Sequence, residues 1–204
     1  MGLCVFTGCS KLVEIYNLSS NNITAGSSDY SDLAWRAKIV HTSLDEESII
    51  TKTSDGYSFM YYKNEYYLLG YLGDSKELVL PSNINGQNYK IYSYAFYNCD
   101  SLTSVTIPNG VTGIDFNAFD DCGSLTSIVI PNSVTRIGDR AFYNCINLTR
   151  KYYNGSQTDW SSIEIREPNS ELRKAKIYYY SETQPTDTDY RYWYYDSKGN
   201  IVIW

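Results

Sequence analysis

Cysteine and histidine are the side chains of this sequence that could ligate a metal or attack a substrate. The chain has five cysteines and a single histidine, His41, and it contains no Cys-x-x-Cys pair. Cys99, Cys122 and Cys145 recur every 23 residues, which indicates one repeated core position rather than converging metal ligands. We expect free thiols that pack as small apolar groups, and no bound metal. A bridge between adjacent repeats is the alternative, although stacked coils do not favour disulfide geometry, and Cys4 lies outside the pattern.

Other catalytic arrangements have little support. His41 falls in a predicted helix with no serine or cysteine nucleophile pattern nearby. Gly70-Tyr71-Leu72-Gly73 lacks the lysine and the spacing of a phosphate-binding loop. Asp120-Asp121 is more simply a turn than the carboxylate pair of a glycosidase. The sequence therefore predicts a protein that is not an enzyme and that uses no cofactor.

A unit of 23 residues is written twice between Leu102 and Leu148, and it explains the cysteine spacing. A fixed period of this length is typical of a solenoid, in which each coil buries its apolar face only by stacking on its neighbours. The shared positions are Leu102, Val105, Ile107, Pro108, Val111, Ile114, Ala118, Phe119 and Cys122, which return as Leu125, Ile128, Ile130, Pro131, Val134, Ile137, Ala141, Phe142 and Cys145.

Each unit predicts one coil. Val105 and Ile107 alternate along a short strand that should end at Pro108, because proline cannot donate a ladder hydrogen bond. Asn109-Gly110 supplies a turn, and Ala118-Phe119-x-x-Cys122 predicts a compact turn that could be helical. The predicted fold class is mainly β with short helices, arranged as a right-handed solenoid with a parallel ladder of strands about 4.8 Å apart.

The position of the repeat divides the chain into four segments. Residues 1–18 resemble the end of a truncated repeat, which favours a fragment of a longer array. Residues 19–73 are predicted as an insertion with a loop, a helix over 31–42 and a β-hairpin of strands 57–62 and 66–72. Residues 74–150 contain the regular repeats. Residues 151–204 are predicted to hold a degenerate last coil and an aromatic hairpin that caps it.

The last coil is aligned by a few positions. Leu172, Ala175 and Ile177 follow the pattern that begins at Leu148, and Asn169 stands in the place of Cys145. This alignment puts Lys174 and Lys176 at the outward positions of the last strand. The capping hairpin is predicted from residues 192–195 and 201–204, joined through a turn at 197–200.

Charge and hydropathy restrict the partners. The net charge is −6, from 17 basic and 23 acidic residues, which argues against nucleic acid or an anionic membrane as the ligand. No apolar run approaches the roughly 20 residues that would insert across a bilayer. Residues 1–9 lack the basic start and the length of a secretory signal peptide.

Residues 102–122 carry a family resemblance. The segment Leu-Thr-Ser-Val-Thr-Ile-Pro-Asn-Gly-Val-Thr-Gly-Ile, followed by Asn-Ala-Phe-x-x-Cys, resembles the BspA-like leucine-rich repeats of bacterial surface proteins. The resemblance covers residues 76–148, and the tail that begins at Tyr152 is similar to segments of such proteins. It implies a leucine-rich-repeat solenoid in a secreted or wall-attached bacterial protein whose array adheres to host matrix proteins or cells. It does not imply a ligand, because members differ at their exposed positions.

We expect the binding surface on the outward positions of the strands, which change from acidic at one end to basic at the other. An extended, graded face of this kind suits a host or neighbouring surface protein. The candidate ligand-binding residues are Glu77, Ser104, Thr106, Ser127, Val129, Arg150, Tyr152, Lys174 and Lys176.

Two alternatives remain open at this point. The aromatic clusters at 178–180 and 192–195 could stack on sugar rings and make the chain a carbohydrate-binding module. The same aromatics could instead pack the cap, which would leave a passive structural spacer that displays other domains.

Overall fold

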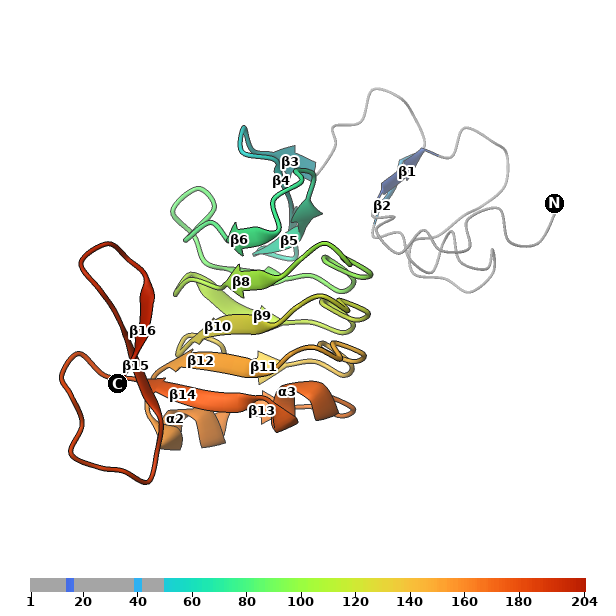
Figure 1. Ribbon diagram of the computed structural model, residues 1–204. Helices are drawn as coiled ribbons and strands as arrows, with labels where there is room; N and C mark the ends of the chain where they lie inside the picture. The colour runs from blue at the N-terminus through green and yellow to red at the C-terminus, as the bar shows by residue number, and fades with distance from the viewer. Residues whose placement is uncertain (1–13, 17–38, 42–49) are drawn as a thin grey trace.

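The computed structural model describes residues 14–16, 39–41 and 50–204 of the chain. Two seven-stranded sheets form the walls of a solenoid whose coils are stacked one on the next (Figure 1). The first sheet has the order β16-β15-β14-β12-β10-β8-β6, and the second has the order β13-β11-β9-β7-β5-β4-β3. The strands of the first sheet are β6 (Glu77–Val79), β8 (Ser104–Thr106), β10 (Ser127–Pro131), β12 (Arg150–Asn154), β14 (Lys176–Tyr180), β15 (Tyr192–Tyr195) and β16 (Ile201–Ile203).

The second sheet joins the hairpin of the predicted insertion to the coils. Strands β4 and β5 are antiparallel, and β5 then pairs with β7 in parallel, so the hairpin extends the stack. Its strands are β3 (Ile50–Lys52), β4 (Tyr57–Tyr62), β5 (Glu65–Tyr71), β7 (Tyr89–Ile91), β9 (Val111–Ile114), β11 (Arg136–Ile137) and β13 (Glu164–Ile165). The predicted hairpin is confirmed, and its turn is formed by Lys63 and Asn64, whose φ angles are 50° and 63°.

One face of this hairpin belongs to the main core. Phe59 and Leu68 are fully buried with the apolar side chains of the coils, and the Phe59 ring lies edge-on to Tyr89 at 5.1 Å. Met60 and Leu69 lie on the other face, in a smaller cluster. The hairpin therefore covers the apolar end that the first coil would otherwise expose.

The repeat places like residues above like. Phe96, Phe119 and Phe142 stack with ring centroids 4.9 and 5.2 Å apart and with interplanar angles of 4° and 6°. A threonine ladder runs beside them: the hydroxyls of Thr126 and Thr149 each donate to a main-chain carbonyl of the preceding coil. Each coil therefore contributes both apolar packing and hydrogen bonds to its neighbour.

The segment around each repeated phenylalanine consists of turns without a helix. Within it, two residues per coil have left-handed φ angles, for example 54° at Asn117 and 61° at Asp121. Two such residues interrupt the helical backbone, so the helical form of this turn is wrong for the coils. The described helices lie at the C-terminal end instead, as α2 (Gln157–Ser162) and α3 (Ser170–Lys174).

In the last coil, the pairing of the strand with its neighbour differs from the predicted register. Leu172 and Asn169 are fully buried at the expected core positions, but Arg150 pairs with Lys176 and Tyr152 with Tyr178. Between the buried leucine and the start of the strand, the last coil has two more residues than the earlier coils, because α3 replaces their extended segment. Lys174 consequently ends α3 and does not stand on the strand.

Near the N-terminus the structure describes two short strands, β1 (Glu14–Tyr16) and β2 (Ile39–His41), which pair in parallel. Residues 39–41 were predicted as the end of a helix over 31–42, and that prediction is wrong for these three residues. The β-branched pair Ile39-Val40 favours an extended backbone. Residues 31–38, Cys4, Cys9 and most of the predicted truncated repeat lie outside the described residues.

Candidate functional site

Five predicted site positions form one column across the first sheet. Glu77, Ser104, Ser127, Arg150 and Lys176 occupy the same position on β6, β8, β10, β12 and β14 and face each other in register. Glu77, Arg150 and Lys176 are exposed, and the two serines are half-buried. We call this set the charged column. Its charge changes from negative at β6 to positive at β12 and β14.

The neighbouring column is largely covered. It runs through Val79, Thr106, Val129, Tyr152 and Tyr178. Val79 is 70% exposed and Thr106 is half-buried, but Val129 and Tyr152 are each only 5% exposed. Val129 and Tyr152, which were predicted to contact a ligand, are therefore buried in this structure and expose almost no side-chain surface.

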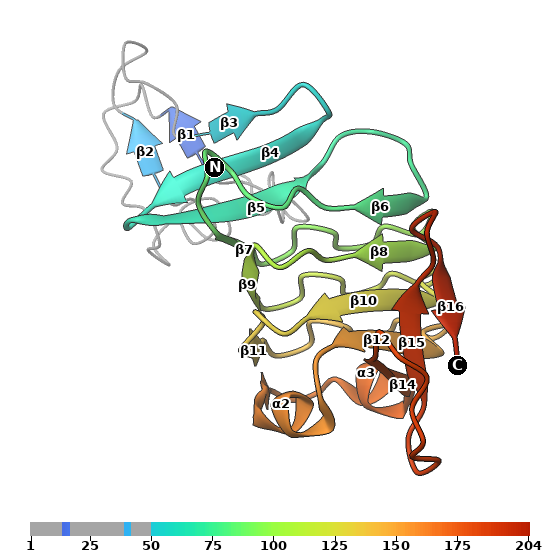
Figure 2. The ribbon, with the colours of Figure 1, turned by 90° about the vertical axis from the view of Figure 1, so that its left-hand side faces the viewer.

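Trp193 is the side chain that covers them. It is fully buried, and its ring centroid lies 5.6 Å from that of Tyr152. Its indole Nε1 donates to the main-chain carbonyl of Tyr153 at 3.2 Å. The hairpin of β15 and β16 runs across the direction of β10 and β12, as Figure 2 shows, and brings the indole over the sheet. The aromatic cap was expected, but the sequence does not indicate which strand positions it covers.

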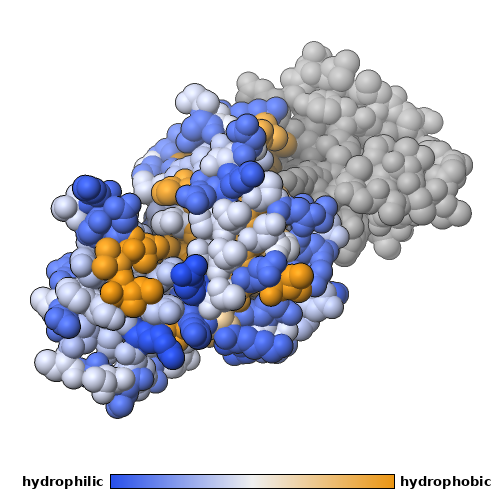
Figure 3. Space-filling model, in the orientation of Figure 1, coloured by the Kyte–Doolittle hydropathy of each residue, from blue (hydrophilic) through white to orange (hydrophobic). Residues whose placement is uncertain are grey.

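The cap also leaves apolar side chains exposed. Ile201 and Ile203 of β16 are 36% and 46% exposed, and an apolar patch lies over this hairpin in Figure 3. Away from it, polar and apolar residues are mixed on the same face of the molecule.

The charged column and the flank of the solenoid differ in their ion pairs. On the flank, Arg166 pairs with Glu164 at 2.8 Å and with Asp139 at 3.8 Å. Within the described part of the chain, Glu77, Arg150 and Lys176 form no salt bridge. Burial raises the pKa of the adjacent Tyr152 hydroxyl, and the Arg150 charge opposes part of this rise. Among the described residues, the three charges of the column are therefore exposed and are not neutralised by an opposite charge.

Lys151 is a buried charge that the sequence analysis missed. It occupies a core position, opposite Ile128 and Ile177, and is 3% exposed. Its Nζ donates to the carbonyls of Leu172 at 2.7 Å and Ala175 at 2.8 Å, which lie at the end of α3. Burial, and then the nearby Arg173 charge, lower the pKa of Lys151 to about 8. The sequence contained one indication of this burial, because Lys151 falls at an inward-facing position of a predicted strand.

Cys122 and Cys145 are free thiols buried in the core, and Cys99, at the same repeat position, is half-buried. The Cys122 sulfur donates to the Phe96 carbonyl at 3.0 Å, and the Cys145 sulfur donates to the Phe119 carbonyl at 3.1 Å. Hydrogen bonding to Cys145, together with burial, raises the pKa of the Cys122 thiol to about 12. These thiols are therefore packing groups, poorly suited to nucleophilic chemistry. Among the described residues, no group of three or more His, Cys, Asp or Glu side chains could hold a metal ion.

No helix in the described ranges is long and apolar enough to span a bilayer.

Solved structures with the same type of repeat are similar to this chain. A leucine-rich repeat protein from Bacteroides capillosus ATCC 29799 is 23% identical, with a TM-score of 0.51, over 65% of this chain and 99% of that one. A T. pallidum leucine-rich repeat protein is 25% identical, with a TM-score of 0.46, over 63% of this chain. The match covers 64% of the T. pallidum chain. A leucine-rich cell surface protein from Faecalibacterium prausnitzii A2-165 is 20% identical, with a TM-score of 0.38, over 78% of this chain and 52% of that one. No curated protein matches.

The stacked coils match the repeats of a known family. The family described as a BspA type leucine-rich repeat region matches residues 74–177 in six copies. These residues contain every coil between β6 and β14. This chain therefore belongs to the family of proteins with a BspA-type leucine-rich repeat region.

Proposed function

We propose that this chain is a non-catalytic protein-binding module that uses the charged column to adhere to a host matrix protein or to a host or neighbouring surface protein. The observation that carries the proposal is the contrast between two adjacent columns on one sheet. The charged column is open to solvent and makes no ion pairs in the described structure, whereas the next column is buried under Trp193 where β10, β12 and β14 contribute to it.

The shape of the column favours a protein partner. Four steps of about 4.8 Å separate its first and last strands, so it extends over about 19 Å, which is longer than a small molecule requires. Because opposite charges steer association, the partner should be basic opposite Glu77 and acidic opposite Arg150 and Lys176. A location outside the cell or on the cell wall is part of the proposal, since it rests on the family resemblance.

The test is binding of the purified chain to immobilised host matrix proteins, measured by surface plasmon resonance. The test variant is the double charge reversal Arg150→Glu, Lys176→Glu. The matched control is Lys52→Glu, Lys198→Glu, which changes the net charge equally at two exposed lysines outside the column. Loss of binding in the test variant alone supports the proposal.

Salt provides a second readout, because exposed ion pairs weaken as ionic strength rises. Binding through the column should weaken between low and high salt in the parent chain and less so in the test variant. If the test variant and the control variant bound the matrix protein equally well, the proposal would be contradicted. Failure of the folded chain to bind any of the matrix proteins would favour the passive spacer.

A further inference from the structure

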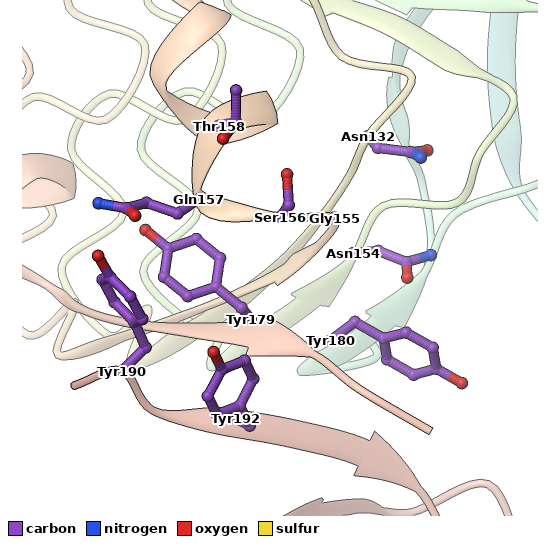
Figure 4. A pocket seen from close by; sticks show the side chains of 10 residues that line it. All are labelled: Asn132, Asn154, Gly155, Ser156, Gln157, Thr158, Tyr179, Tyr180, Tyr190 and Tyr192. Carbon is purple, nitrogen blue, oxygen red and sulfur yellow. The ribbon is translucent and has the colours of Figure 1, made fainter. Parts of the chain in front are cut away.

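The C-terminal end of the solenoid is hollowed by a pocket of about 500 Å³. Its walls come from the loop after β10, the start of α2, strand β14 and the segment that enters β15 (Figure 4). A volume of this size lies within the range of about 300–1,000 Å³ that is usual for small-molecule sites. The pocket lies at the ends of β10, β12 and β14, whereas the charged column lies at the starts of the same strands.

Tyrosine rings form one part of the pocket. Figure 4 shows Tyr179, Tyr190 and Tyr192 gathered beside Gln157. Tyr179 is buried and lies edge-on to Tyr190 at 5.9 Å. The Tyr192 hydroxyl donates to Asp187 at 3.0 Å, which holds this ring in place. Tyr190 is 40% exposed, so its ring is accessible from solvent. Aromatic surface is therefore presented by side chains that are already positioned.

Carboxamides form the rest of the polar lining. Asn132 and Asn154 lie with Tyr180 further along the pocket, apart from the group around Gln157 (Figure 4). In the described part of the chain, the side chains of Asn132, Asn154 and Gln157 have no hydrogen-bond partner, and no lining residue is charged. Each carboxamide offers both a donor and an acceptor.

We propose that this pocket binds a neutral oligosaccharide. Sugar rings present apolar C–H faces, which suit tyrosine rings, and pairs of hydroxyls, which suit carboxamides that both donate and accept. The separation of the Gln157 group from the Asn132 and Asn154 group favours more than one sugar ring. An anion would find no cation in the lining, and a quaternary ammonium ion would leave the carboxamides unpaired.

Burial and stacking decide which of the C-terminal aromatic side chains could contact the sugar. Tyr178 and Trp193 are 9% and 0% exposed beneath the cap and are unavailable. Tyr194 stacks on Trp204 at 4.2 Å. Of the rings that line the pocket, Tyr190 is exposed and lies in no strand, and Tyr180 and Tyr192 are half-buried. Tyr179 is only 6% exposed and supports Tyr190 by packing against its ring.

The probes are β-1,4-linked oligomers of glucose and of N-acetylglucosamine, α-linked mannose oligomers and N-acetyllactosamine. Each is titrated into the whole chain to about 10 mM, so that a Kd of about 1 mM is detected, and is followed by two-dimensional NMR. The test variants are Tyr190→Ala and Gln157→Ala. The matched control is Tyr195→Ala, because Tyr195 is also 40% exposed and also packs edge-on against one ring, that of Trp193.

We expect at least one oligosaccharide to bind with shifts at the pocket, and Tyr190→Ala to weaken it about tenfold. Gln157→Ala should weaken it as well, while Tyr195→Ala and the charge reversal at Arg150 and Lys176 should leave it unchanged. Absence of binding by every probe would overturn the proposal. So would an equal loss in Tyr195→Ala, or displacement of the sugar by choline. These outcomes are independent of binding through the charged column.

Discussion

The amide N–H of Phe142 donates to the Oδ1 atom of Asn169 at 2.8 Å. In the two preceding coils the same N–H is accepted by a main-chain carbonyl: Phe96 donates to Ala118 and Phe119 donates to Ala141, each at 2.8 Å. The Asn169 side chain thus replaces the carbonyl that a further regular coil would supply. Its Nδ2 donates back to the Gly138 carbonyl at 2.9 Å. One carboxamide therefore ends the hydrogen-bond pattern of the repeat.

Asn169→Leu should lower the free energy of unfolding by about 3 kcal/mol, because it leaves buried main-chain donors and acceptors unpaired. Urea unfolding followed by circular dichroism measures the change. The control is Asn147→Leu, since Asn147 is exposed and its Nδ2 also donates to a main-chain carbonyl of the preceding coil, that of Gly123 at 2.7 Å. Equal losses in the two variants would contradict the role of Asn169 at the end of the stack.

Lys151 should make the protein more stable as the pH rises from about 8 toward 10. Its pKa is about 8 in the folded chain against an ordinary value of 10.5, so the unfolded chain holds the proton more strongly in this window. Stability then rises by up to about 1.4 kcal/mol per pH unit. The Cys122 thiol from about pH 9, and tyrosines such as Tyr57 from about pH 10, act in the opposite direction, because their pKa values in the folded chain are raised to about 12. Urea unfolding at pH 7.5, 9 and 10 measures the trend.

Lys151→Met should remove this rise, and Lys176→Met should keep it because Lys176 is exposed on the same sheet. A rise of the same size in Lys151→Met would show that another group is responsible.

Asp120 should have the opposite effect at acidic pH. The residue is 5% exposed, and its Oδ1 atom has no hydrogen-bond partner within the described structure. Burial, followed by the charge of Asp121, raises the pKa of Asp120 to about 6. The folded chain therefore holds the proton more strongly, and stability falls as the pH rises from about 4 to 6. Asp120→Asn should flatten this fall and stabilise the chain at pH 7, whereas Asp100→Asn, at an exposed position, should do neither.

Gly110 and Ser133 occupy the same repeat position in successive coils but have different surroundings. A Cβ at Gly110 would lie 1.6 Å from the main-chain carbonyl oxygen of Ser82. Ser133 occupies the corresponding place one coil later, where its hydroxyl donates to the Val111 carbonyl at 2.7 Å. Gly110→Ser should therefore lower the free energy of unfolding by about 3 kcal/mol, because the backbone must move.

Ser133→Gly should cost less, about 1 kcal/mol for one lost hydrogen bond. Thermal and urea unfolding compare the two variants. A Gly110→Ser protein as stable as the parent would show that the backbone at Ser82 can move without cost.

The repeated part of the fold could be predicted from the sequence. Spacing alone aligned Val105 with Ile128, and the structure pairs these residues in the ladder. The same alignment identified Glu77, Ser104, Ser127 and Arg150 as one column. This succeeds because each coil contacts only its neighbours, so the interactions that decide the fold recur at a fixed interval. The two hairpins were also predicted, because alternation and turn residues are local signals.

The accessible part of the candidate site was decided only by tertiary structure. Trp193 lies 40 residues from the Tyr153 carbonyl that it contacts, and nothing in its local sequence indicates that it covers Val129 and Tyr152. Likewise, the helical turn of α3 shifted the last strand and removed Lys174 from it. Repetition carries no information about segments that occur once, so their docking follows from packing against the finished stack. The strand face and the capping hairpin were therefore predictable from the sequence, while the strand positions that the hairpin covers were not.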